Sequence, residues 1–139
     1  KDRSIALHIS DNLPLIRGDC VLLEQVLVNL IDNAGKYSAA DQTIEIKAEL
    51  SYDKLVVSVA DQGDNIPEAD KTKIFDKFYR GSRVRTIPGT GLGLFICKAI
   101  IEAHKGKIWV SNLTGSGKRF VFVLPVEGRI NAEFENIDN

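Results

Sequence analysis

The 139-residue sequence has no methionine, two cysteines, four prolines and one tryptophan. The two cysteines, Cys20 and Cys97, form neither a disulfide framework nor a metal-binding spacing, so we expect buried, reduced thiols. No apolar run approaches the roughly 18 residues of a membrane-spanning helix, and no signal peptide opens the chain. The formal net charge of −1 argues against a general nucleic-acid binder. Because the chain starts at Lys1 and lacks methionine, we expect it to be part of a longer protein.

The residues that are present describe one globular domain, with 44% hydrophobic and 27% charged residues. Period-two alternation in residues 4–9, with Ile5, Leu7 and Ile9 on one face, predicts a half-buried strand. Alternation also predicts a strand at 43–50, and a run that is apolar on both faces predicts a central strand at 55–60. Further strands are predicted at 107–111 and 119–124. Helical spacing predicts helices at 20–37, with Asp19 as the N-cap, and at 91–104. This order predicts an α+β fold, a two-layer sandwich, over residues 1–126. Residues 127–139 form an acidic C-terminal tail that we expect to be disordered.

The first predicted helix carries a polar face made of Asn29, Asn33 and Lys36. Asparagine is a mediocre helix former, so two of them within a helix suggest a function. Their amide oxygens suit Mg²⁺, and Lys36 would meet phosphate charge beside it. The alternative is a solvated helix face without a function.

A second feature is Asp61, which ends a buried strand and is followed by Gly63. A carboxylate at this position can accept a hydrogen bond from the exocyclic amine of a base, and glycine allows close backbone approach. An ordinary Asx-turn uses the same residues, and the sequence leaves both readings open.

A third feature is the glycine-rich run Gly89-Thr-Gly-Leu-Gly-Leu94, which opens the second predicted helix. Exposed N–H groups at a helix N-terminus bind anions, and the arginines at 80, 83 and 85 suit a polyphosphate. The run is not a dinucleotide fingerprint, because no buried strand precedes it. Gly115-Ser-Gly-Lys118 is not a Walker A loop, because the upstream glycine is missing. A flexible surface loop remains the alternative.

Taken together, four blocks resemble the catalytic and ATP-binding domain of sensor histidine kinases, in the ATPase superfamily shared with gyrase, Hsp90 and MutL. The blocks are residues 24–38 (N box), 61–67 (G1 box), 74–81 (F box) and 89–94 (G2 box), and the resemblance covers residues 4–126. Two segments look like those of the potassium-responsive KdpD group: Ile74-Phe-Asp-Lys-Phe-Tyr-Arg-Gly81 and Cys97-Lys-Ala-Ile-Ile-Glu-Ala-His104.

The resemblance implies the Bergerat ATP-binding fold, a mixed, mostly antiparallel sheet backed by three helices, with a mobile ATP lid. It implies a transferase of a two-component system that binds Mg-ATP and passes the γ-phosphoryl to a histidine on a dimerisation domain absent from this sequence. It further implies a cognate response regulator, no nucleic-acid partner, and a cytoplasmic domain of a membrane-bound homodimeric parent.

The resemblance also assigns roles to individual residues. Asn33 would coordinate Mg²⁺ with help from Asn29, Lys36 and Arg80 would contact phosphates, Tyr37 would pack on adenine, and Asp61 would bind its amino group. The remaining expected ATP-binding residues are Gly63, Ile66, Thr90, Gly91, Leu92, Gly93 and Leu94. Phe75 and Phe78 would anchor the lid by packing, and no catalytic residue is expected within this chain.

Three departures from the family pattern bear on these roles. Asn65 replaces the second glycine of the G1 box; asparagine tolerates a left-handed backbone, but its bulk could crowd the nucleotide and weaken ATP binding. Lys118 stands where a threonine or serine is usual, so the adenine end would lose a hydroxyl and its water network. His8 and His104 do not resemble the acceptor motif and read as solvent-facing structural histidines, so the chain should not autophosphorylate alone.

Two rival functions remain open at the level of sequence. One is a related ATPase or anti-sigma serine kinase. The other is a degenerate partner-binding module in which Asn65 and Lys118 have closed the nucleotide pocket.

Overall fold

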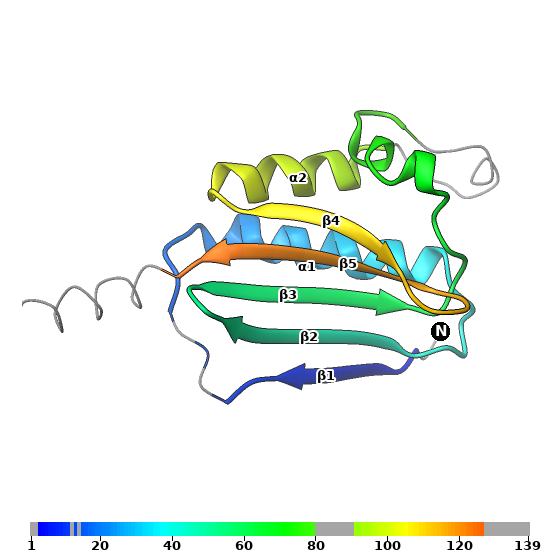
Figure 1. Cartoon of the computed structure of the whole chain (residues 1–139), viewed down its shortest axis with the longest axis horizontal. Coiled ribbons are helices and arrows are strands. Elements are labelled where there is room, and N and C mark those ends of the chain that lie inside the picture. Colours follow the sequence, from blue (N-terminus) through cyan, green and yellow to red (C-terminus); the bar gives the residue numbers. More distant parts are fainter. Residues whose placement is uncertain (1–2, 12, 14, 80–90, 127–139) are drawn as a thin grey trace, which may run out of the picture.

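The computed structural model describes residues 3–11, 13, 15–79 and 91–126. In chain order, the elements are β1 (Ile5–Ile9), α1 (Cys20–Lys36), β2 (Ile44–Ser51), β3 (Lys54–Asp61), two 3₁₀ segments η1 (Glu68–Asp70) and η2 (Lys73–Phe75), α2 (Gly93–Ala103), β4 (Lys107–Asn112) and β5 (Lys118–Pro125) (Figure 1). Each predicted strand and helix is present in this order, and α2 starts two residues later than the pattern predicts.

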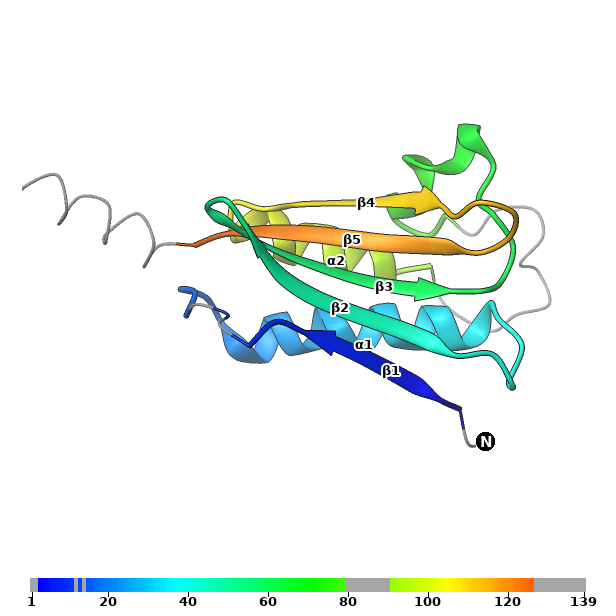
Figure 2. The same cartoon turned by 60° about the horizontal axis from the view of Figure 1, so that its bottom comes forward.

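The strands form one five-stranded sheet in the order β1-β2-β3-β5-β4. β1 runs parallel to β2, and the other three pairings are antiparallel. The two α-helices lie on one face of this sheet, and η1 and η2 lie near the start of α2 (Figures 1 and 2). The predicted α+β sandwich with a mixed, mostly antiparallel sheet is confirmed.

The hydrophobic core lies between the sheet and the helices. One face of α1 packs there, with three of its residues buried. The strands contribute alternate residues, and α2 contributes one side. These buried core residues include Val26, Leu30, Ala34, Ile44, Ile46, Val57, Val59, Cys97, Ile101, Phe120, Phe122 and Leu124. β3 is the central strand, as its apolar pattern predicts.

The prediction that β1 is half-buried is wrong. Ile5, Leu7 and Ile9 alternate as expected, but they are 47%, 63% and 49% exposed. β1 is an edge strand, whereas α1 packs against β2, β3 and α2. The periodicity therefore identified the strand, but not whether another element covers its apolar side.

Both ends of α1 are closed by side chains. At the start, the carboxylate of Asp19 accepts hydrogen bonds from the N–H groups of Val21 and Leu22, as expected of an N-cap. At the end, the guanidinium of Arg3 donates five hydrogen bonds to the last turn of the helix and the segment that follows, among them one to the Gly35 carbonyl and one to the Ser38 hydroxyl. Arg3 thus ties the chain before β1 to the C-terminal end of α1.

The prediction that His104 faces solvent is wrong, whereas His8 is exposed as expected. The Nε2 atom of His104 accepts a hydrogen bond from the backbone N–H of Asp19 at 3.0 Å, and Nδ1 lies 2.8 Å from the Ile100 carbonyl. The imidazole therefore joins the end of α2 to the start of α1. Of the two cysteines, Cys97 is buried as predicted, but Cys20 is exposed.

Several sequence predictions concern residues outside the described part of the chain. These are the acidic tail 127–139 and the segment 80–90, with Arg80, Gly89 and Thr90. In the described ranges, neither helix has the length and apolar character needed to cross a membrane.

Candidate nucleotide-binding site

The polar face of α1 includes a buried oxygen that has no partner. Asn33 Oδ1 is inaccessible to solvent, and no hydrogen-bond donor among the described residues contacts it. Buried polar atoms are nearly always satisfied, so an unpaired one suggests an absent ligand. Asn29 lies one turn earlier, and Lys36 is exposed at the end of the helix. A neutral amide oxygen in this setting fits a hard cation such as Mg²⁺.

Described residues include no cluster of three or more histidine, cysteine or acidic side chains able to hold a metal. Any cation here would therefore rely on amide oxygens and on oxygens from outside the protein, such as phosphate and water. Mg²⁺ commonly binds in this way, with few protein ligands.

Asp61 ends β3 and is almost completely buried, with 1% of its surface exposed. Its Oδ1 accepts a hydrogen bond from the Gly63 N–H at 2.8 Å, which is the Asx-turn contact that the sequence allowed. Oδ2 is buried and has no hydrogen-bond partner within the described chain. The Asx-turn therefore accounts for a hydrogen bond to Oδ1, whereas Oδ2 remains available as a hydrogen-bond acceptor.

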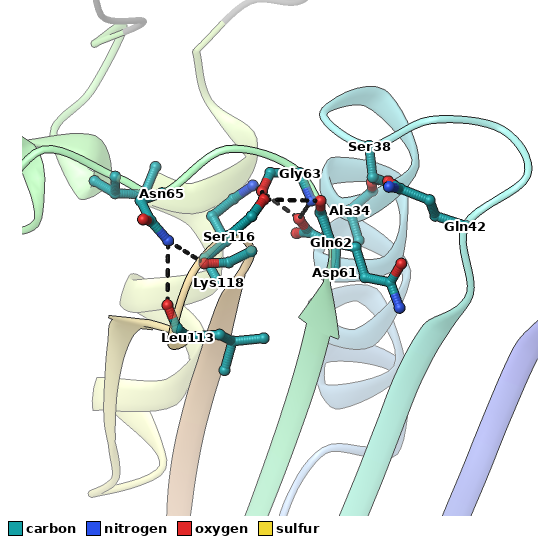
Figure 3. Close-up of polar contacts among 12 residues, drawn as sticks. Ala34, Ser38, Gln42, Asp61, Gln62, Gly63, Asn65, Leu113, Ser116 and Lys118 are labelled. Carbon is teal, nitrogen blue, oxygen red and sulfur yellow. Dashed lines mark hydrogen bonds and ion pairs between the residues drawn. The ribbon is translucent and has the colours of Figure 1, made fainter.

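Asp61 Oδ1 has a second partner, Lys118, which is one of the departures from the family pattern. Lys118 begins β5 directly opposite Asp61, and its Nζ lies 3.2 Å from Asp61 Oδ1. Lys118 is 1% exposed, and its ammonium lies 5.6 Å from the centre of the Tyr37 ring. The structure thus puts a buried cation where we expected only the loss of a hydroxyl (Figure 3).

Close backbone contacts hold the G1 turn against α1 and the β4–β5 turn. A Cβ atom at Gly63 would lie 1.9 Å from the Tyr37 carbonyl oxygen, so no other residue fits there. A Cβ atom at Gly117 would lie 2.5 Å from the Asp61 carbonyl oxygen, and the φ of Gly117 is +100°. Ser116 adds a hydrogen bond from its hydroxyl to the Gly63 carbonyl at 2.8 Å. Glycine is required at both contact points.

Asn65 does not adopt the left-handed backbone that we considered for it, since its φ is not positive. Its side-chain amide instead donates to the carbonyls of Gly117, at 2.6 Å, and Leu113, at 3.5 Å (Figure 3). Next to it, Asn112 exchanges two hydrogen bonds with the backbone of Ile66, which is buried. Asn112 was not found from the sequence, where nothing in its neighbourhood distinguishes it from a surface asparagine.

The aromatic residues of the F box behave differently from one another. Phe75 is buried and packs edge-to-face on Phe120 of β5, with ring centres 6.1 Å apart. Phe78 is 62% exposed, so its predicted packing role is wrong; its φ is +67°, and Lys77 Nζ lies 5.3 Å from its ring. The hydroxyl of Tyr79, which sequence reasoning did not single out, donates to Asp70 at 2.7 Å.

The described part of the G2 box joins the F box to α1. The Phe78 N–H donates to the Gly91 carbonyl at 2.9 Å, and a Cβ atom at Gly91 would lie 2.8 Å from Phe78. Asn29 Nδ2 lies 3.4 Å from the Gly93 carbonyl. α2 begins at Gly93 after Leu92, without a side-chain cap, and Leu94 is half-buried. The backbone N–H groups at the start of α2, which no side chain caps, can bind an anion.

The structure thus brings the four sequence blocks together around α1. The N box contacts the G1 box through Tyr37 and Gly63, and the G2 box through Asn29 and Gly93. The family model described as "Histidine kinase-, DNA gyrase B-, and HSP90-like ATPase" matches residues 18–128. The chain belongs to this family. Like its other members, this histidine kinase-like ATPase domain is a nucleotide-binding module.

Two curated relatives are similar over most of this ATPase domain. The sensor protein KdpD of Escherichia coli (strain K12) is 41% identical over 121 residues, which is 87% of this chain and 14% of KdpD. The adaptive-response sensory kinase SasA of Thermosynechococcus vestitus is 42% identical over 127 residues, which is 91% of this chain and 33% of SasA. The chain therefore spans between a seventh and a third of the length of these relatives.

Solved histidine kinase structures share the fold of this ATPase domain. The catalytic domain of ThkA has a TM-score of 0.77 and 36% identity, covering 88% of this chain and 79% of that one. Full-length ShkA in complex with AMPPNP has a TM-score of 0.75 and 32% identity, covering 88% of this chain and 25% of that one. ThkA in complex with the response regulator TrrA has a TM-score of 0.70 and 38% identity, covering 87% of this chain and 34% of that one.

Proposed function

We propose that this domain binds Mg-ATP through Asn29, Asn33, Lys36, Tyr37 and Asp61. In a longer chain it delivers the γ-phosphoryl group to a histidine on a dimerisation domain. The observation that carries the proposal is the pair of buried, unpartnered oxygens, Asn33 Oδ1 and Asp61 Oδ2, on two of the blocks gathered around α1. Unpaired buried acceptors are costly, so both are expected to be satisfied by a ligand.

Each oxygen has a distinct task in this proposal. Asp61 Oδ2 accepts a hydrogen bond from the base, and the Tyr37 ring offers a flat apolar face beside it. Asn33 Oδ1, with Asn29 next to it, holds the cation, and the uncapped start of α2 donates N–H groups to phosphate oxygens. The cation, when bound, neutralises phosphate charge. Phosphoryl transfer depends mostly on such positioning and electrostatic stabilisation, and these are what the named residues would supply.

The named relatives support the rest of the proposal. KdpD is a sensor protein and SasA a sensory kinase, the ShkA structure contains an ATP analogue, and the ThkA structure contains a response regulator. We infer that this chain likewise serves a cognate response regulator. A homodimeric, membrane-anchored parent, with this domain on the cytoplasmic side, completes the proposal.

The decisive experiment is a calorimetric titration of the chain with a non-hydrolysable ATP analogue, with and without Mg²⁺. We expect magnesium-dependent binding that Asn33→Ala weakens by about tenfold or more, because the variant removes the unpaired oxygen. Asp32→Ala, an exposed neighbour on the same helix, is the matched control and should bind like the wild type. Circular dichroism verifies that both variants are folded.

Other results would favour the rival functions. A folded wild-type protein that binds no nucleotide at millimolar concentration would refute the proposal in favour of a partner-binding module. Phosphate release by the domain alone, or phosphorylation of a serine on a partner protein, would favour the ATPase or anti-sigma kinase. Transfer of radiolabelled phosphate to an added histidine-bearing dimerisation domain would support the kinase.

A further inference from the structure

Asn112 holds the far end of the G1 turn. Its side-chain oxygen accepts a hydrogen bond from the Ile66 N–H at 2.7 Å, and its side-chain nitrogen donates to the Ile66 carbonyl at 2.9 Å. The two residues are 46 positions apart in the sequence, and Ile66 is only 9% exposed. One side chain thus satisfies both backbone groups of a buried residue, as a residue of a neighbouring strand would.

The place of Asn112 in the sheet explains how it reaches Ile66. Asp61 at the end of β3, Lys118 at the start of β5 and Asn112 at the end of β4 form one row across the sheet. The G1 turn leaves this row at Asp61, and Ile66 contacts Asn112 two strands away, so the turn crosses the end of β5. Both ends of the turn are therefore attached to the same sheet, one through the backbone of β3 and the other through the Asn112 side chain.

The middle of the G1 turn has its own contacts with the β4–β5 turn. The Ser116 hydroxyl donates to the Gly63 carbonyl at 2.8 Å, and the Asn65 amide donates to the Gly117 carbonyl at 2.6 Å (Figure 3). Each of these side chains binds a single backbone carbonyl, whereas Asn112 binds both backbone groups of one residue. Asn112 is therefore the contact that fixes where the turn ends.

The shape of the turn decides how the Asp61 carboxylate is presented. The Gly63 N–H donates to Asp61 Oδ1 at 2.8 Å, and Oδ2 is the carboxylate oxygen without a partner among the described residues. If Ile66 were released, the turn could carry the Gly63 N–H away from Oδ1, and the carboxylate would lose one of the contacts that orient it. Binding groups act well only when such supporting contacts fix their geometry.

We propose that Asn112 is a positioning residue for nucleotide binding, which fixes the G1 turn through Ile66 and thereby orients Asp61 Oδ2 toward the amino group of the base. The inference rests on the nucleotide-binding function proposed above. Asn112 itself does not touch the nucleotide in this arrangement, because both polar atoms of its side chain are engaged with Ile66.

The contact with Ile66 requires an amide. An amide presents an acceptor beside a donor, which is what the N–H and carbonyl of one residue demand. An aspartate at position 112 would still accept from the Ile66 N–H, but its second oxygen would face the Ile66 carbonyl, and two acceptors repel each other. Asn112→Asp is therefore a nearly isosteric variant that turns one of the two hydrogen bonds into a repulsion.

The test uses two probes that differ only at the base, a non-hydrolysable ATP analogue and its counterpart that lacks the 6-amino group. Calorimetry in the presence of Mg²⁺ gives both dissociation constants. The wild-type chain should bind the ATP analogue about tenfold or more tightly than the counterpart, because only the former donates to Asp61. In Asn112→Asp this preference should fall below about threefold, through a loss of affinity for the ATP analogue.

Two further variants complete the design. Asn112→Ala removes both hydrogen bonds without adding a repulsion, should reduce the preference in the same direction, and covers the case in which Asn112→Asp does not fold. Thr114→Ala changes an exposed side chain of the same β4–β5 turn and should keep the wild-type preference. Urea unfolding verifies that each variant is folded under the conditions of the titration.

The ratio of the two affinities separates positioning from a general effect on the fold. If the folded Asn112 variants keep the wild-type ratio, or bind both probes more weakly by the same factor, the inference is overturned and the function stands. The same holds if the wild type binds the ATP analogue with the expected dependence on Asn33 but does not distinguish the two probes. If neither probe binds to the wild type, the function and the inference both fail.

Discussion

The buried ion pair between Asp61 and Lys118 should dominate the response of this domain to mutation, and a double-mutant cycle can measure it. The two side chains are 0% and 2% exposed, and their charged atoms lie 3.2 Å apart. Removing one partner of such a pair leaves an uncompensated buried charge, which typically costs about 3–5 kcal/mol. We expect Lys118→Met to lower the free energy of unfolding by this amount, since Asp61 Oδ2 already has no other partner among the described residues.

The second single variant and the double variant complete the cycle. Asp61→Asn keeps the acceptor for the Gly63 N–H but removes the negative charge beside the buried ammonium, so we again expect a loss of about 3 kcal/mol or more. The double variant is neutral at both positions and should lose only about 1–2 kcal/mol relative to the wild type. The coupling energy between the two positions should therefore exceed about 2 kcal/mol. A domain with the usual 5–15 kcal/mol of stability tolerates each loss.

Urea unfolding followed by circular dichroism provides the assay, because a change in midpoint at constant slope reports stability alone. The matched control is the pair between Lys71 and Glu68, whose charged atoms are closer, at 2.9 Å, but in which Glu68 is 89% exposed. Glu68→Gln should cost under about 0.5 kcal/mol, because solvent screens exposed pairs. If Lys118→Met costs no more than Glu68→Gln, or if the coupling energy is near zero, the reasoning from burial is refuted.

Two further predictions concern other contacts. Arg3→Ala should lower the free energy of unfolding by about 2 kcal/mol, because it removes five hydrogen bonds at the end of α1. Arg3→Lys, which lacks the planar guanidinium, should recover less than half of that stability. A loss under about 0.5 kcal/mol in the alanine variant would contradict the capping role. Burial raises the pKa of the Cys97 thiol from 9.0 to about 11, against a smaller opposing effect of the Asn29 hydrogen bond. The folded state therefore holds this proton more tightly than the unfolded state, and its stabilising contribution, present below pH 9, should be lost between about pH 9 and 11, by about 2–3 kcal/mol. Urea unfolding measured across this range should show the loss of stability in the wild type and a weaker pH dependence of stability in Cys97→Ala. The same pH dependence in both proteins would contradict the prediction.

Most of the secondary structure could be predicted because it depends on local patterns. Alternation identified β2, a run that is apolar on both faces identified the central strand β3, and helical spacing identified α1, with Asp19 at its start. These patterns reflect which face of an element meets the core, and neighbouring residues in the sequence are enough to reveal them. Asn33, Asp61 and Gly63 could likewise be singled out, because an asparagine within a helix and an aspartate followed by glycine at a strand end are unusual.

The remaining features depend on residues far apart in the sequence. The apolar face of β1 looked like a core face, but whether a helix covers an edge strand is decided by the packing of α1 elsewhere. His104 looked like a surface residue at a helix end, and its contact with Asp19 spans 85 positions. Lys118 and Asp61 are 57 positions apart, so no local pattern could have paired them.

The two departures from the family pattern near Asp61 belong to one structural unit. Asn65, in place of a glycine, uses its side-chain amide to hold the Gly117 carbonyl at 2.6 Å, and Gly117 immediately precedes Lys118. The side-chain amide of this asparagine therefore fixes the turn that carries the lysine. A buried lysine needs a fixed strand to keep it against its partner, because an unpaired buried ammonium is costly. The change at position 65 thereby supports the change at position 118, and the two together hold a positive charge against Asp61.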